Sequence, residues 1–347
     1  MKEQEVALGI WGKYIYVWIL LCMVIGVLLG RFLSGFLPVF ELLLETWTVY
    51  GLSIPIGIAL FLVMYPTVAE IEIKEIKKAT KKPKPLLLTL IGNWLIAPII
   101  MTLLANFFLA GYPDFIAGAI LLGIAPCTAL VLFWIKMARA DLGQGIVNTA
   151  INSLTLLGLY GFSAGAFLGV SGIPVPWELI ALGVILYIAV PIGLGIILRI
   201  ELTKRRGKAW YDNKYLPIMR RLAIVGLVFD LILIFAYGGE PIINNPAVVG
   251  LISIPLLIQY GIMVALLYGV AWLLNWDYET SACSALIGSS SHFEVAIAVA
   301  ITLWGVRSGA VLATVIGPLW EVPLMIMASK LFLRSKHFFP RKSKVGG

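Results

Sequence analysis

The chain has 347 residues, of which 61% are hydrophobic and 13% are charged, and its mean hydropathy is +0.98. A soluble domain is about 45–50% apolar and about 25% charged, so this composition excludes a soluble or disordered protein. The apolar runs are long and continuous, whereas a membrane β-barrel has short alternating segments. The composition therefore predicts an all-α polytopic membrane protein, and it does not suggest a nucleic-acid partner.

Ten apolar runs are long enough to cross a bilayer, which takes about 20 residues each. The first run is too long for the hydrophobic region of a signal peptide, so we expect it to remain as a span. In chain order the predicted spans are 14–37, 46–69, 86–110, 114–138, 142–170, 178–201, 218–239, 247–275, 280–305 and 309–333.

Basic residues are concentrated in alternate connections between these spans, and only Arg31 and Arg307 fall on the opposite side. By the positive-inside rule, both termini are predicted to be cytoplasmic, including a basic tail at 334–347, in a plasma-membrane protein. The net charge of +8 is then explained mainly by topology. A specific role in binding anionic lipid is the minor alternative.

The ten spans divide into two sets of five, 14–170 and 178–333, within a single transporter unit over 1–347. Because five is odd, the second set must be inverted relative to the first, an arrangement that many secondary transporters share. The sequence therefore predicts two inverted five-helix repeats.

The fourth span of each set is interrupted in a corresponding position. One interruption is Gly123-Ile124-Ala125-Pro126-Cys127-Thr128, and the other is Gly288-Ser289-Ser290-Ser291-His292-Phe293-Glu294. Pro126 removes a backbone donor, and Gly288 with the serine run loosens the second helix. Unwound backbone at membrane depth survives only beside protein or water, so we expect discontinuous helices 4 and 9 to cross at a binding site. Two ordinary kinks are the alternative.

Three carboxylates, Asp230, Glu294 and Glu321, lie deep in spans. An unpaired ionised carboxylate there is costly, so each is expected to be protonated, solvated or bound to a cation. Glu294 lies at a break and is predicted to bind substrate and couple protons. Glu321, between two prolines, is expected either to couple protons or to accept structural hydrogen bonds. Asp230 is compatible with a hydrogen bond between helices.

Cys127 follows Pro126 at a break, and a thiol is a ligand for soft metals and metalloids. Cys22 and Cys283 lack that context and are expected to pack as small apolar side chains. Asn148 and Gln259 could be either cavity residues or hydrogen-bonding contacts between helices. The other polar residues predicted to line the substrate cavity are Asn93, Asn152, Ser153, Ser290, Ser291 and His292.

Seven motifs stand in a fixed order along nearly the whole chain. They are Pro55-Ile56-Gly57 through Met64-Tyr65-Pro66, Gly92-Asn93-Trp94 through Pro98, Gly123 through Ala129, Asn152-Ser153, Trp210-Tyr211 through Tyr215-Leu216-Pro217, Phe293 through Ala300, and Gly317-Pro318 through Glu321-Val322-Pro323. This ordered set resembles the arsenite efflux permeases of the bile acid/arsenite/riboflavin transporter superfamily. The family usually has asparagine where Ser291 stands, and asparagine or phenylalanine where His292 stands.

The resemblance implies a fold like that of the bile acid sodium symporters, with a core and a panel domain. It also implies export of arsenite, and often antimonite, driven by proton exchange. In that family the cysteine that matches Cys127 and the glutamate that matches Glu294 are transport residues. No cofactor is implied, and the oligomeric state is left open.

Two alternatives remain at this point. A sodium-coupled symporter of a small organic anion could use the same fold, with sodium held at the second break. An intramembrane hydrolase could use Cys127, His292 and Glu294, although no hydrolase signature is present.

Overall fold

The computed structural model describes residues 15–32, 47–49, 52–69, 83–128, 130–305 and 307–340. Over these ranges the regular elements are helices, apart from one antiparallel pair of two short strands. In chain order the elements are α3 (Ile15–Phe32), β1 (Thr48–Val49), β2 (Leu52–Ser53), α5 (Ile54–Ala69), α7 (Pro83–Ile91), α8 (Ala97–Phe108), α9 (Pro113–Gly123), α10 (Val131–Met137), α11 (Leu142–Val170), α12 (Trp177–Val184), α13 (Val190–Arg206), α14 (Lys208–Trp210), α15 (Leu216–Asn244), α16 (Pro246–Leu273), α17 (Tyr278–Ser289), α18 (Phe293–Trp304) and α19 (Gly309–Ser335), followed by a 3₁₀ turn (Lys336–Phe338).

Three π-helical turns connect α-helices without interrupting them: Gly92–Ile96, Ile185–Ala189 and Tyr211–Tyr215. Each ends two residues before a proline, at Pro98, Pro191 and Pro217 respectively. A proline inside a helix has no N–H to donate and its ring crowds the preceding turn. A wider turn accommodates that misfit, and such turns are frequent at functional sites.

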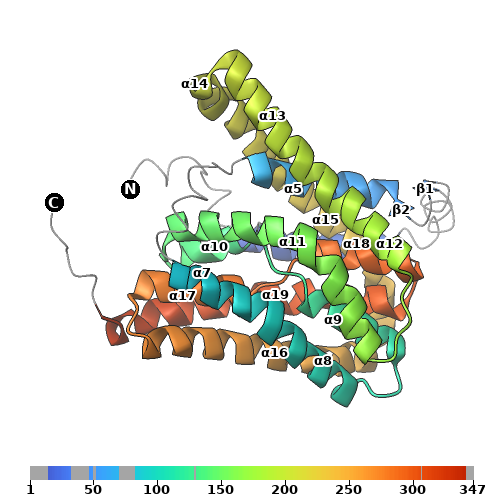
Figure 1. Ribbon diagram of the computed structural model, residues 1–347. Helices are drawn as coiled ribbons and strands as arrows, with labels where there is room; N and C mark the ends of the chain where they lie inside the picture. Colours follow the sequence, from blue (N-terminus) through green and yellow to red (C-terminus); the bar gives the residue numbers. More distant parts are fainter. Residues whose placement is uncertain are drawn as a thin grey trace.

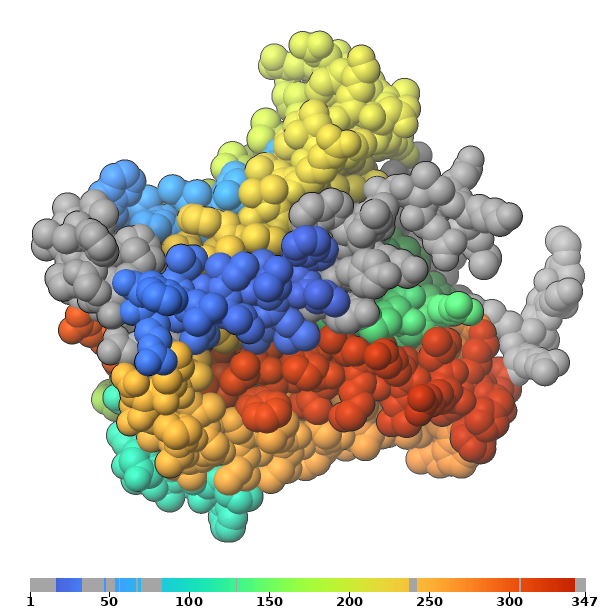
Figure 2. Space-filling view, turned by 180° about the vertical axis from the view of Figure 1, so that it is seen from behind, coloured from blue at the N-terminus to red at the C-terminus, as the bar shows by residue number. Residues whose placement is uncertain are grey.

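The helices form two packed groups (Figure 1). In one, α15 packs on α3 and α5, and α13 packs on α5. In the other, α9 packs on α8, α18 and α19, and α16 packs on α8, α17 and α19. Figure 2 shows α3 lying along α15 and above α19 on the opposite face. The interrupted helices α9–α10 and α17–α18 both belong to the second group.

A glycine pair brings α3 and α15 into close contact. A Cβ atom added at Gly30 would lie 2.2 Å from the carbonyl oxygen of Ala236, and one added at Gly26 would lie 2.7 Å from Cβ of Phe235. Two glycines four residues apart are a recurrent means of close helix packing in membranes, where van der Waals contact replaces the hydrophobic effect.

Five of the described helical segments are long and apolar enough to cross a membrane: Pro83–Phe108, Leu142–Val170, Trp177–Arg206, Pro246–Leu273 and Gly309–Phe338. Shorter apolar helices lie at Val17–Phe32, Gly57–Pro66, Pro113–Gly123 and Phe293–Trp304. The last two end or begin at the interruptions noted in the sequence, which is why each is short.

One predicted boundary was wrong. The second span was expected from residue 46, but the helix begins at Ile54, and the antiparallel pairs Thr48–Ser53 and Val49–Leu52 precede it. Most of the stretch 202–217, between the sixth and seventh predicted spans, is helical: α13 continues to Arg206 and helix resumes at Lys208. Lys, Arg, Glu and Leu are good helix formers, so this polar stretch stays helical. Gly207, with φ +82°, makes the turn between the two helices.

Parts of other predictions lie outside the described residues. These are residue 14 and residues 33–37 of the first predicted span, residue 46 of the second, and the basic tail beyond residue 340.

Candidate functional site

Two helix breaks meet in the second group of helices. The first separates α9, which ends at Gly123, from α10, and the second separates α17 from α18. The N–H of Cys127 donates to the carbonyl oxygen of Ser290 at 3.2 Å, and the N–H of His292 donates to that of Ala125 at 2.7 Å. Between these two bonds, Pro126 and Ser291 face each other as an antiparallel bridge. Each break therefore satisfies backbone groups that the other leaves free, as unwound chain requires at membrane depth.

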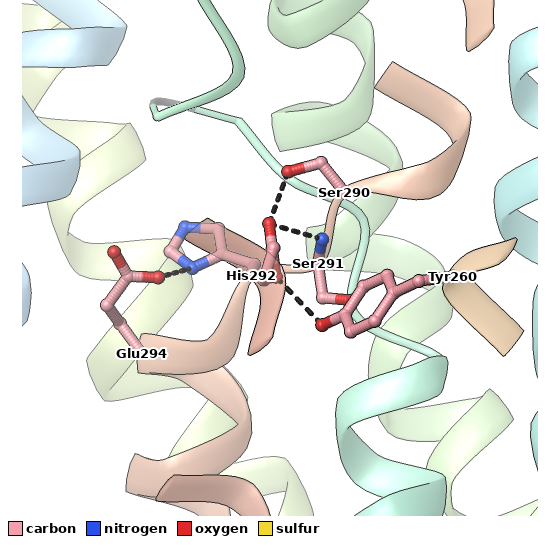
Figure 3. A network of polar contacts seen from close by, with 6 residues as sticks. Tyr260, Ser290, Ser291, His292 and Glu294 are labelled. Atoms are coloured by element: carbon pink, nitrogen blue, oxygen red, sulfur yellow. Dashed lines mark hydrogen bonds and ion pairs between the residues drawn. The ribbon is translucent and has the colours of Figure 1, made fainter. Parts of the chain in front are cut away.

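The carboxylate of Glu321, on α19, is bound directly to the second break. Its Oε1 atom accepts hydrogen bonds from the Ser290 hydroxyl at 2.5 Å and from the Ser291 N–H at 3.1 Å. Its Oε2 atom accepts a bond from the Tyr260 hydroxyl, on α16, at 3.0 Å. Figure 3 shows these three groups converging on one carboxylate. The Glu321 side chain is completely buried, so three donors replace the water that it has lost.

Glu294 lies on the other side of the break and pairs with His292. The two side chains are buried, and Nδ1 of His292 lies 2.9 Å from Oε2 of Glu294 (Figure 3). Asp230, buried on α15, interacts electrostatically with Glu294. Its Oδ2 atom has no hydrogen-bond partner among the described residues. Asp230 and Glu294 belong to different packed groups, so this interaction links the two groups.

Cys127 is buried in the first break, and a polar ladder from α11 supports it. Nδ2 of Asn152 donates to the Cys127 carbonyl oxygen at 3.2 Å, and Nδ2 of Asn93 donates to Oδ1 of Asn152 at 3.3 Å. Asn93 lies in the π-helical turn before Pro98.

In the described part of the chain, several residues singled out in the sequence make their contacts away from the paired breaks. Ser153 donates to the Thr149 carbonyl of its own helix at 3.0 Å. Asn148 donates to Thr89 Oγ1 at 3.1 Å, as a contact between helices. Gly288 is helical and lies two residues before the break begins, so it is not the break itself. A Cβ atom at Gly288 would lie 2.3 Å from Cδ1 of Leu267, and the glycine instead allows α17 to pack closely on α16.

A small cavity lies where the breaks meet α8 and α16. It is lined by Asn93, Ala97, Gly123, Ala125, Pro126, Gln259, Met263 and Gly288 through Ser291, and its volume is about 10 Å³. A volume of about 10–15 Å³ is needed for one water molecule, so this space holds one water molecule at most. Gln259, whose Nε2 donates to the Ala97 carbonyl at 3.3 Å, forms part of its wall.

Tyr260 is a site residue that sequence reasoning missed. Aromatic residues are common in apolar spans, so Tyr260 does not stand out in the sequence. The one feature that could have indicated a polar site there is the neighbouring Gln259. Within the described residues there is no cluster of three or more His, Cys, Asp or Glu side chains that could hold a metal ion. Among the described residues, His292 Nε2 has no hydrogen-bond partner, and Nδ1 of His292 lies against Glu294 and not against Cys127.

Comparison with known proteins gives the family of this chain. The model of the Sodium Bile acid symporter family matches residues 57–245. The chain is 41% identical over 354 residues to the Uncharacterized transporter slr0944 of Synechocystis sp., a match that covers 96% of this chain and 91% of that protein.

Two further relatives are Arsenical-resistance proteins named Acr3. The protein from Alkaliphilus metalliredigens is 37% identical over 351 residues, covering 97% of this chain and 96% of its own length. The protein from Corynebacterium glutamicum is 33% identical over 338 residues, covering 94% of this chain and 89% of its own length. The chain therefore belongs to the sodium/bile acid symporter family, in its Acr3 branch, and is a multi-pass membrane transporter.

Proposed function

We propose that this transporter exports arsenite, and antimonite, from the cytoplasm in exchange for protons. The observation that carries the proposal is the buried Cys127, whose N–H is bonded to Ser290 while the Ser290 hydroxyl is bonded to Glu321. A soft sulfur ligand and a carboxylate thus share one hydrogen-bonded unit. The names of the two Acr3 relatives support a metalloid as the substrate.

The chemistry of arsenous acid suits a single thiol. Near neutral pH it is a small, uncharged trihydroxide. When the Cys127 sulfur attacks, an arsenic–sulfur bond forms and an arsenic–oxygen bond breaks. The thiol proton leaves with the hydroxide as water, and arsenic stays in the +3 state. A single bond of this kind can be reversed on the other side of the membrane, whereas three thiols would hold the metalloid too tightly for turnover.

Substrate entry requires the two breaks to separate, because the cavity between them has a volume of only about 10 Å³. We assign α3, α5, α13 and α15, which pack together, to the panel, with α12, which continues into α13. The remaining helices form the core. The core would rock against the panel and so expose Cys127 first to the cytoplasm and then to the exterior. Asn93, Asn152, Ser153, Ser290, Ser291 and His292 would line the opened cavity.

Protons are carried by Glu294 and Glu321 in this proposal. Glu294 takes a proton from the exterior as the substrate leaves, and its pairing with His292 gives it a neighbour with which to exchange one. Glu321 changes its interactions with the break when it gains a proton, because a neutral carboxyl accepts hydrogen bonds less strongly than a carboxylate. Protonation is thereby linked to the backbone that positions Cys127.

We also propose ten spans, arranged as inverted repeats over 14–170 and 178–333, with both termini in the cytoplasm of a plasma-membrane protein. The ends of three helices support this orientation. Lys336, after α19, lies 3.3 Å from Glu279 at the start of α17, and the Tyr278 hydroxyl donates to the Ala138 carbonyl at the end of α10. Basic residues Lys136, Arg139, Arg334 and Lys336 gather at this end, as expected of a cytoplasmic face.

A sodium-coupled symporter of a small organic anion is the second candidate, and the description of the matching family favours it. Glu321 argues against a simple sodium site, because both its oxygens already accept hydrogen bonds. The two candidates differ in the ion whose gradient drives uptake and in their need for a thiol.

Inside-out vesicles that contain the protein distinguish these candidates. Arsenite uptake is measured under an imposed pH gradient or an imposed sodium gradient, with the wild type, Cys127→Ser and the matched control Cys22→Ser. We expect pH-driven uptake in the wild type and in Cys22→Ser, and background uptake in Cys127→Ser. Uptake that follows sodium alone, or that survives in Cys127→Ser, would contradict the proposal.

A further inference from the structure

A groove between α16 and α19 is not part of the paired breaks. It has a volume of about 460 Å³, and Tyr260, Gly261 and Val264 line it from α16. From α19 it is lined by residues between Pro323 and Arg334, including the outward-facing Met327 and Leu331. Figure 2 shows α16 and α19 side by side at the surface. Apart from its two ends, the groove has apolar walls.

One end of the groove is positively charged. Lys330 and Arg334 both line it, are exposed, and stand four residues apart on one face of α19. The described lining residues include no acidic side chain. An occupant of this end therefore meets two cations.

Aromatic residues place that end at the membrane–water interface. The Tyr268 ring packs on Phe332, with ring centroids 3.9 Å apart, and its hydroxyl lies 2.7 Å from Ser335 Oγ. Nε1 of Trp272 donates to the Phe338 carbonyl at 3.2 Å. Tyrosine, tryptophan and basic residues together are typical of headgroup depth.

The length of the groove matches one leaflet. At 1.5 Å per residue, the helix from Pro323 to Arg334 spans about 17 Å. Half of a hydrocarbon core is about 15 Å thick. The groove thus runs from the interface almost to the midplane, where it ends at Tyr260, whose hydroxyl is bonded to Glu321.

We propose that this groove binds one anionic phospholipid of the cytoplasmic leaflet, with an acyl chain along the apolar walls and the phosphate on Lys330 and Arg334. A small polar solute would make no apolar contact with the walls of the groove. An uncharged lipid would make no ion pair with Lys330 and Arg334. The lipid would touch the Tyr260 ring, directly behind the Glu321 carboxylate. The site is independent of which substrate the protein transports, so its test measures lipid binding alone.

Two variants remove different parts of the site. The double variant Lys330→Gln/Arg334→Gln removes the two positive charges of the groove. Its control is Lys204→Gln/Arg205→Gln, which removes two positive charges at the end of α13, away from the groove. Gly261→Leu fills the groove, because a Cβ atom there meets nothing within 4 Å. Gly269→Leu is its control on the same helix, since a Cβ atom at Gly269 also meets nothing within 4 Å and this residue does not line the groove.

The full chain is purified with equal amounts of phosphatidylglycerol and phosphatidylcholine, and retained lipid is counted by native mass spectrometry. We expect the wild type to retain phosphatidylglycerol selectively. The Lys330/Arg334 double variant should retain it about tenfold to thirtyfold less, at about 1 kcal/mol per basic residue. Gly261→Leu should lose it, and both controls should match the wild type.

Three results would overturn the proposal. One is equal retention of the two lipids by the wild type, and another is unchanged selectivity in either groove variant that folds. The third is a dimer that Gly261→Leu dissociates, which would mean that a second copy of the chain covers the groove. Because one variant changes only exposed charge and the other only fills space, misfolding of either one leaves the other decisive.

Discussion

The Tyr260 hydroxyl on α16 donates a hydrogen bond of 3.0 Å to Oε2 of Glu321 on α19, while the other Glu321 oxygen is held by the break between α17 and α18. A single buried carboxylate thereby connects two continuous helices to the unwound segment that pairs with Cys127. A change in the charge of Glu321 must alter all of these contacts together. The first two predictions below rest on this connection.

Glu321→Gln should slow transport by about tenfold or more, because hydrogen bonds to a charged acceptor are worth about 1.5–3 kcal/mol. The amide also presents N–H groups to donors that need an acceptor. Arsenite uptake under a fixed pH gradient is the measurement, with Tyr260→Phe as a milder comparison that removes one of the three donors. Wild-type rates in Glu321→Gln at every gradient would show that the carboxylate has no part in transport.

Ser290→Ala should impair transport, whereas Ser281→Ala should not. The Ser290 hydroxyl is bonded to Glu321, but the hydroxyl of Ser281, which is outside the cavity lining, donates to the Asp277 carbonyl at 2.8 Å. The two variants make the same chemical change at two buried serines. Initial rates of arsenite uptake compare them, and equal rates in the two variants would contradict the assignment.

Asn152→Ala should destabilise the protein by about 1–3 kcal/mol, because it leaves the Cys127 carbonyl and the Asn93 amide without a partner in a buried region. It should also raise KM for arsenite, since the first break loses its support. Asn148→Ala, on the same helix, removes a contact with Thr89 and should affect stability alone. Thermal unfolding in detergent and KM separate the two effects, and a parallel rise of KM in both variants would argue against a local role for Asn152.

Gly30→Ala should lower the thermal stability, because the added Cβ atom would lie 2.2 Å from a backbone oxygen of α15. Overpacking of this kind costs about 1–3 kcal/mol. Gly158→Ala, in α11, is the control, because its Cβ atom would meet nothing within 4 Å. That change should be neutral or slightly stabilising through helix propensity. A melting temperature for Gly30→Ala at or above that of the wild type would contradict the packing described for α3 and α15.

The sequence was sufficient for the all-α membrane class, because long apolar runs have few other structures available to them. It also singled out the segments around Pro126 and Ser290, since proline and serine runs disturb a helix locally. Hydropathy ends the sixth predicted span at residue 201, whereas α13 continues to Arg206, because hydropathy marks only where the chain is apolar and basic residues are also good helix formers.

The contacts of Glu321 could not be read from the sequence. Tyr260 and Glu321 are 61 residues apart, and their meeting depends on how α16 packs on α19. Glu294 has one neighbour that is close in sequence, His292, and one that is not, Asp230 on α15. Only the fold reveals the second. Composition and spacing indicate that buried carboxylates need partners, and only the fold identifies them.

The central claim is that a single thiol, that of Cys127, captures arsenite at the paired breaks. Arsenic X-ray absorption of the purified protein incubated with arsenite tests it most directly, because sulfur and oxygen neighbours of arsenic scatter differently. We predict one sulfur neighbour in the wild type and in Cys22→Ser, and an all-oxygen shell in Cys127→Ser. An all-oxygen shell in the wild type, or a sulfur neighbour that persists in Cys127→Ser, would contradict the claim.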